Sequence, residues 1–150
     1  MKLAVRYARM VVSTPDAFRM LASALDGGAE ISARWKTTSD VGPGWSGSGR
    51  SVSLEGFEAP PEVLAAIEAA LVRFFGLPPT SPDLYWSGDG VIEREGDLLV
   101  VDYEYSCGVP YDQPVFYDID AQPLFDLGTG AELEPKRKPW ADVGCKPDEA

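Results

Sequence analysis

The sequence predicts an α+β domain in which two helices pack on one face of a mainly antiparallel sheet. Residues 14–27 and 60–76 repeat apolar side chains at the spacing of amphipathic helices. Residues 31–37 and 98–105 alternate apolar and polar side chains, as half-buried strands do. The expected order is strand, helix, strand, strand, helix, strand, strand, and its first six elements match the ferredoxin-like, or split βαβ, arrangement. We expect a C-terminal β-ribbon and an irregular tail in addition.

The segment from Pro60 to Gly76 is the longest periodic stretch, and we expect the domain to be built around it. Two prolines, at 60 and 61, suit the first turn of a helix, and Gly76 can take the left-handed conformation that ends one. Glu68 lies at the rim of the apolar arc, where we expect a solvated boundary residue. Wound as a helix, the arc spans roughly 120° and holds Val63, Leu64, Ile67, Leu71, Phe74 and Phe75.

Three elements are predicted before residue 40. Lys2–Val12 alternates apolar residues and ends in an apolar run, which indicates a central strand. Thr14 and Pro15 provide a helix start, and Gly27 ends that helix. Glu30–Thr37 is expected to be a half-buried strand. Its two faces are expected to hold Ile31, Ala33 and Trp35 on one side and Ser32, Arg34 and Lys36 on the other.

A glycine-rich connector, residues 42–49, precedes a predicted strand at Arg50–Glu55. It contains a G-x-G-x-x-G pattern, but in a dinucleotide site that pattern opens a helix. Here a strand follows and Pro43 occupies the turn, so we discount a phosphate site. We expect instead a loop tipped by Trp45, whose indole either anchors a partner or folds back over the sheet.

The chain after the second helix is expected to form hairpins. Val91–Arg94 and Leu98–Tyr105 are joined by a turn with glycine at its centre. Beyond residue 108 prolines recur, so only short strands are expected, at Val115–Asp120 and in a ribbon of Leu124–Leu127 with Ala131–Leu133.

Length and composition fit one domain over residues 1–135, followed by a flexible tail over residues 136–150. Arginines at 6 and 9 interrupt the apolar N-terminus, which excludes a signal peptide or a membrane span and predicts a cytoplasmic protein. Cys107 and Cys145 lie far apart and are expected to be free thiols.

The charge is strongly polarised along the chain. The net charge is −11. Residues 1–50 carry seven Lys or Arg and four acids, a balance of +3, which leaves −14 for residues 51–150. Between Asp83 and Glu134 there are thirteen acids and one base, Arg94. Such a surface repels nucleic acid and anionic membranes and attracts a basic protein.

The chain contains no histidine, which removes Ser-His and Cys-His nucleophiles, imidazole bases and His-ligated metals. We therefore name no catalytic residue and no cofactor, and expect a binding protein rather than an enzyme. Interleaved acids and aromatics supply anchors within a steering field. The candidate partner-binding residues are Trp45, Asp102, Glu104, Tyr111, Asp112, Phe116, Asp118, Asp120 and Asp126.

Three functions compete for this acidic, aromatic segment. The favoured one is a small bacterial inhibitor, of the immunity-protein, antitoxin or phage-inhibitor kind, that covers the basic surface of a toxin or nucleic-acid-acting enzyme with carboxylates in place of phosphates. The alternative is a carboxylate-dependent hydrolase, with or without a divalent metal, if Asp118 and Asp120 lie beside Asp102 and Glu104. The third reading is structural: the acids solvate the sheet and block edge-to-edge pairing.

Overall fold

The computed structural model describes residues 12–42, 45–77, 85–108 and 115–135. The predicted strand at Lys2–Val12, Val12 excepted, and the predicted tail with Cys145 lie outside this part of the chain. The elements of the described part are the helices α2 (Thr14–Asp26) and α3 (Pro61–Phe75) and the strands β1 (Ile31–Gly42), β2 (Trp45–Glu55), β3 (Tyr85–Glu95), β4 (Leu98–Gly108), β5 (Val115–Asp126) and β6 (Ala131–Glu132).

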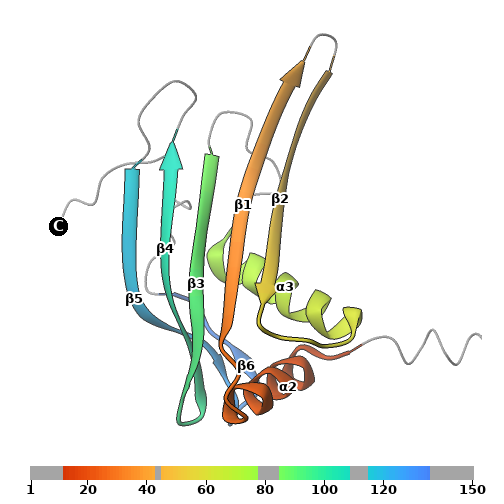
Figure 1. The fold of residues 1–150 in the computed structure, drawn as a ribbon, viewed down its shortest axis with the longest axis vertical. Helices are drawn as coiled ribbons and strands as arrows, with labels where there is room; N and C mark the ends of the chain where they lie inside the picture. Colours follow the sequence, from red (N-terminus) through yellow and green to blue (C-terminus); the bar gives the residue numbers. More distant parts are fainter. Residues whose placement is uncertain (1–11, 43–44, 78–84, 109–114, 136–150) are drawn as a thin grey trace, which may run out of the picture.

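The described strands form one antiparallel sheet in the order β2-β1-β3-β4-β5-β6. The sheet curls into a half-barrel, and both helices pack against the same side of it (Figure 1). The predicted α+β class is therefore confirmed, but the ferredoxin-like order is not. In that order the strand at residues 31–37 would be an edge strand, whereas β1 lies between β2 and β3 and pairs with both.

Helix α3 buries the predicted apolar arc against the sheet. Its buried side chains are Val63, Ile67, Ala70, Leu71, Phe74 and Phe75. Leu64 is only half-buried, and Ala70 joins the buried set. Gly76 ends the helix with φ 67°, the predicted left-handed conformation. The shorter helix α2 packs on the same face of the sheet and reaches β5, because Phe18 stacks on Phe125 of that strand at 4.4 Å between ring centroids.

Strand β3 is longer than predicted, although it contains two glycines. The sequence indicated a strand only at Val91–Arg94, whereas β3 begins at Tyr85 and pairs with β4 as far as Gly108. Gly88 and Gly90 lower strand propensity, but side chains of the neighbouring strands occupy the space above them. A β-carbon on Gly88 would lie 2.6 Å from Cζ2 of Trp35, and one on Gly90 would lie 2.8 Å from Cβ of Tyr103.

The aromatic cluster above β3 ties α3 to the middle of the sheet. The Trp35 ring stacks on Phe75 at 3.8 Å and meets Tyr103 edge-on at 5.8 Å. All three side chains are nearly inaccessible to solvent. The absence of side chains at the two glycines of β3 is therefore what allows the rings of β1 and β4 to meet over the strand between them.

The prediction of a glycine-rich loop over residues 42–49 is wrong. β1 extends to Gly42 and β2 begins at Trp45, and these two residues face each other in the ladder. Pairing with β1 supplies backbone hydrogen bonds that outweigh the low strand propensity of glycine. Trp45 is thus the first residue of a strand rather than the tip of a loop, and of this residue only the backbone is described.

The predicted short strands after residue 108 are one strand, β5, which continues through Pro123. The ladder between β4 and β5 is irregular between Leu99 and Val100 and between Val101 and Tyr103. Pro123, which cannot donate to a ladder, faces Val100 at this irregularity. The predicted C-terminal ribbon is confirmed, since Phe125 and Asp126 pair with Glu132 and Ala131.

Candidate functional site

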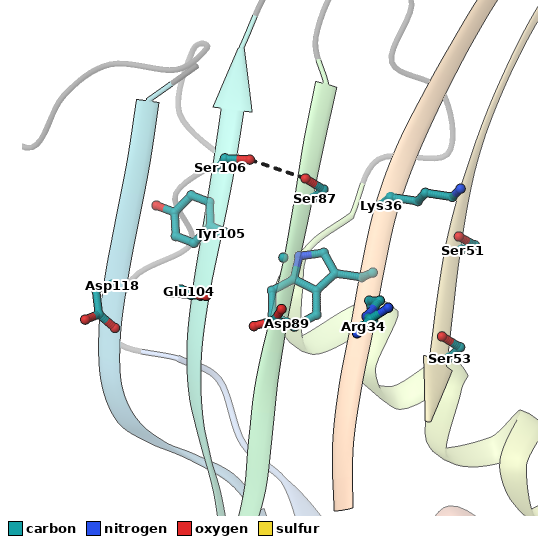
Figure 2. A pocket seen from close by; sticks show the side chains of 12 residues that line it. Arg34, Lys36, Ser51, Ser53, Ser87, Asp89, Glu104, Tyr105, Ser106 and Asp118 are labelled. Atoms are coloured by element: carbon teal, nitrogen blue, oxygen red, sulfur yellow. Dashed lines mark hydrogen bonds between the residues drawn. The ribbon is translucent and has the colours of Figure 1, made fainter. Parts of the chain in front are cut away.

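The side of the sheet opposite the helices, which we call the open face, carries a hollow of about 750 Å³. Strand alternation places the lining side chains there, because their neighbours in sequence, such as Trp35, point into the core. Figure 2 shows these side chains in front of the strands, with a helix behind them. The lining side chains of the open face are Arg34, Lys36, Ser51, Ser53, Ser87, Asp89, Glu104, Ser106 and Asp118.

Backbone register aligns these side chains in two rows that run across the strands. The first, which we call the charged row, joins Ser53, Arg34, Asp89, Glu104 and Asp118 from β2 to β5. The second, the serine row, joins Ser51, Lys36, Ser87 and Ser106. The hydroxyls of Ser87 and Ser106 are hydrogen bonded at 3.3 Å between oxygens.

Three carboxylates stand next to one another in the charged row. Side chains directly opposite on neighbouring antiparallel strands lie about 5 Å apart at Cβ, and like charges in that relation are destabilising. Asp89 and Glu104 oppose each other, as do Glu104 and Asp118. A cationic group seated over Glu104 would relieve both repulsions.

The cations of the open face lie on β1, at one side of the carboxylates. Arg34 is next to Asp89 in the charged row, and its Nη1 lies 3.8 Å from Oε1 of Glu55. This ion pair is exposed and long, so it contributes little to stability. None of the side chains that the structure describes forms an ion pair with Lys36. The open face is therefore negative over β3 to β5 and positive over β1.

The structure brings together some of the predicted site residues. Glu104 and Asp118 face each other, and Asp102 precedes Glu104 by two residues on the same strand, so all three share the open face. Asp126 lies apart, at the end of β5, where its carboxylate accepts hydrogen bonds from the N–H groups of Gly128 and Thr129 at 2.9 and 3.2 Å. This carboxylate stabilises the turn that leads into β6.

The other predicted residues are placed in the backbone only or not at all. Phe116 pairs with Ser106, and Asp120 belongs to β5 near its irregularity, but the side chains of both are outside the described structure, as is that of Trp45. Tyr111 and Asp112 fall in residues 109–114, which the described ranges omit. The role of these five residues stays a prediction.

Several lining residues of the open face were not predicted as site residues. Arg34 and Lys36 were expected on the outer face of a strand. The alternation of apolar and polar side chains in that strand could therefore have identified them as site residues. Asp89 was missed because the stretch around Gly88 and Gly90 was not assigned to a strand. Only the register of β3 reveals that Asp89 extends the carboxylates of Glu104 and Asp118.

Within the described ranges, no group of His, Cys, Asp and Glu side chains is arranged to hold a metal ion. The same ranges contain no helix long and apolar enough to cross a membrane. Comparisons of the chain with protein-family models, curated proteins and solved structures gave no match. Its function has to be inferred from the chemistry of the open face.

Helix α3 contains a carboxyl whose pKa is shifted by its surroundings. Glu68 is half-buried at the rim of the buried arc, as predicted, and desolvation by burial raises its pKa above the ordinary 4.5. A raised pKa means that the folded state binds this proton more tightly than the unfolded state does. The stability associated with the protonated group is therefore present at low pH and lost as pH rises through the folded pKa.

We expect Glu68→Gln to raise the melting temperature slightly at pH 7, because the variant has no charge to desolvate. At pH 4, where the carboxyl is largely protonated, the variant and the wild type should melt alike. Thermal unfolding at the two pH values measures the difference, with Glu58→Gln, at an exposed position, as the control that should show no gain. An equal gain at both pH values would mean that desolvation of the charge is not the cause.

Proposed function

We propose that this protein is a small binding protein or inhibitor, of the immunity-protein, antitoxin or phage-inhibitor kind, and that its open face covers a basic surface of a partner protein. The observation that carries the proposal is the charged row, in which Asp89, Glu104 and Asp118 stand side by side on three adjacent strands. Asp102 adds a fourth carboxylate on the same side of β4.

The row is suited to a partner that normally binds nucleic acid. Lys and Arg side chains in a nucleic-acid groove are spaced to meet successive phosphates, and a rigid sheet presents carboxylates at a regular interval of about 5 Å between strands. The net charge of −11 would steer such a partner toward this protein and raise the association rate. Cationic side chains that enter the hollow would lower the repulsion within the row.

The rest of the hollow supplies groups that orient the partner. The serine hydroxyls can donate or accept hydrogen bonds, so they suit the polar rim of an interface. Arg34 and Lys36 repel a second basic group over β1. Basic side chains of the partner therefore bind over β3 to β5, and this asymmetry selects one orientation of the partner.

The test requires the partner, which affinity purification from the native host followed by mass spectrometry would identify. Surface plasmon resonance then compares the wild type with the double variant Glu104→Lys and Asp118→Lys. We expect association to slow by at least about tenfold at low salt, and less at high salt because the charges are screened. The matched control, Glu30→Lys with Glu58→Lys, makes the same change in net charge at exposed residues outside the hollow and should slow association less.

Two outcomes would contradict the proposal. If the open-face variant associates with an unchanged rate at low salt, the charged row is not the interface. If Mg²⁺, Mn²⁺ or Ca²⁺ raises the melting temperature and Asp118→Ala abolishes the rise, the carboxylates bind metal, and the carboxylate-dependent hydrolase becomes the better hypothesis.

A further inference from the structure

The outer edge of β2 has the features of a strand that can pair with another chain. β2 is the first strand in the order of the described sheet, so only β1 pairs with it there. Its register with β1 is unbroken from Ser32 opposite Glu55 to Gly42 opposite Trp45. Bulges and prolines are the usual devices that block edge pairing, and Trp45–Glu55 contains neither.

We infer that β2 pairs in antiparallel fashion with β2 of a second copy of this chain, around a twofold axis at Ser53. In this register Ser53 faces Ser53 of the second copy, and Val52 faces Leu54 on the helix side of the sheet. Val52 and Leu54 are partly buried residues that already pack against the core. The interface is isologous, so every contact occurs twice, and the two sheets become one continuous sheet.

The same register is favoured by charge. It places Glu55 of the second copy opposite Ser51, whose other neighbour is Lys36. The backbones of Lys36 and of Glu55 in the second copy are two strand spacings apart, about 10 Å. Their long side chains can meet above Ser51, which lies between them and is small. Figure 2 shows Arg34 and Lys36 beside the serines of β2. Among the described side chains, none forms an ion pair with Lys36, so this pairing gives Lys36 a partner. The existing contact of Glu55 with Arg34 is long and exposed, and therefore competes only weakly.

Glu55 is the last residue of β2 that can take part, because the chain turns at Gly56. Gly56 has φ +83°, and a β-carbon there would lie 1.9 Å from the carbonyl oxygen of Glu30. The strand therefore leaves the line of the edge at this point, so the proposed contact ends at Glu55 and, by the twofold symmetry about Ser53, at Ser51.

The large negative charge of the chain lies outside this edge. Each copy has a net charge of −11, but residues 31–55 contain three cations (Arg34, Lys36 and Arg50) and two acids (Asp40 and Glu55), a balance of +1. Salt screens the overall repulsion, so self-association should strengthen as salt rises. Binding of a basic partner to the open face should weaken with salt, so the two interactions are distinguishable by their opposite dependence on salt.

Sedimentation velocity over a range of protein concentrations, at 0.05 and 0.5 M NaCl, tests the inference. We expect the wild type to form a dimer that is tighter at the higher salt. Ser53→Lys places two lysines across the axis beside Arg34, and like charges directly opposite are destabilising. This variant should raise the dimer dissociation constant at least about tenfold. Ser23→Lys, the same substitution at an exposed position on α2, should leave it unchanged.

Exchanging the charges of Lys36 and Glu55 tests whether the contact between these two residues, rather than the edge in general, stabilises the dimer. Glu55→Lys should weaken the dimer, because it brings a lysine next to Lys36 of the other copy, and Lys36→Glu combined with Glu55→Lys should restore it. Circular dichroism melting of each variant shows that the monomer is folded. A wild type that stays monomeric up to about 1 mM protein at both salt concentrations, or a dimer that Ser53→Lys leaves intact, would overturn the inference.

Discussion

Replacing Leu71 with alanine is expected to lower the free energy of unfolding by about 2 to 5 kcal/mol, the usual cost of deleting a buried leucine side chain. Leu71 lies on α3 with 0% of its surface exposed, between the helix and the curled sheet. The removed atoms leave a cavity that the rings of Phe74 and Phe75 cannot fill without leaving their places in the core. Chemical denaturation with urea measures the change.

The matched control is Met20→Ala on α2, which removes a long apolar side chain that is 43% exposed. Its effect should stay within about 0.5 kcal/mol, as for most surface positions. If Leu71→Ala costs no more than this control, α3 is not the helix on which the domain depends.

Adding a single methyl group at Gly88 is expected to lower the free energy of unfolding by about 3 kcal/mol, the upper end of the usual range for overpacking. The new β-carbon would lie 2.5 Å from the carbonyl oxygen of Glu104 and 2.6 Å from Cζ2 of Trp35. The backbone oxygen cannot turn aside, since it belongs to the strand paired with β3. The ring of Trp35 would have to leave its stack on Phe75.

Gly27→Ala provides the control for the general effect of replacing a glycine. Gly27 ends α2 with φ −80°, which alanine adopts freely, and its nearest neighbour would be 3.4 Å from the new β-carbon. Its stability should change by less than about 1 kcal/mol. A Gly88→Ala variant as stable as this control would show that the aromatic cluster does not occupy the space above β3. Near-ultraviolet circular dichroism reports on the environment of all the aromatic side chains, so a change in Gly88→Ala that is absent from Gly27→Ala is expected where the Trp35 stack is displaced.

Local signals were sufficient for the helices and for parts of the strands. The apolar arc of α3, the prolines at its start and Gly76 at its end act within a few residues of one another, so the sequence alone predicts the element and its buried side. Alternation in Glu30–Thr37 and Leu98–Tyr105 likewise predicts which side chains point inward. The C-terminal ribbon was predicted because its turn residues lie between its two strands.

The candidate site was predictable only in part, because local signals do not specify which strands are neighbours. Period-two alternation places Asp102 and Glu104 on one face of a strand, but it does not say which residue of another strand lies beside them. The pairing of Glu104 with Asp118 and with Asp89 comes from the register of three strands. Asp89 escaped prediction because its glycine neighbours weaken strand propensity, and what compensates is Trp35, more than fifty residues earlier in the chain.

The sequence by itself therefore determined an α+β domain with an amphipathic central helix, the inward and outward sides of its strands, and a strong negative charge after residue 50. Only the tertiary structure decided the strand order, the long β1–β2 and β3–β4 hairpins, and the charged row on the open face. Helix period and caps depend on residues within one or two turns of each other. Strand neighbours depend on contacts between distant residues, where the packing of Trp35 over Gly88 and of Tyr103 and Val101 over Gly90 outweighs local propensity.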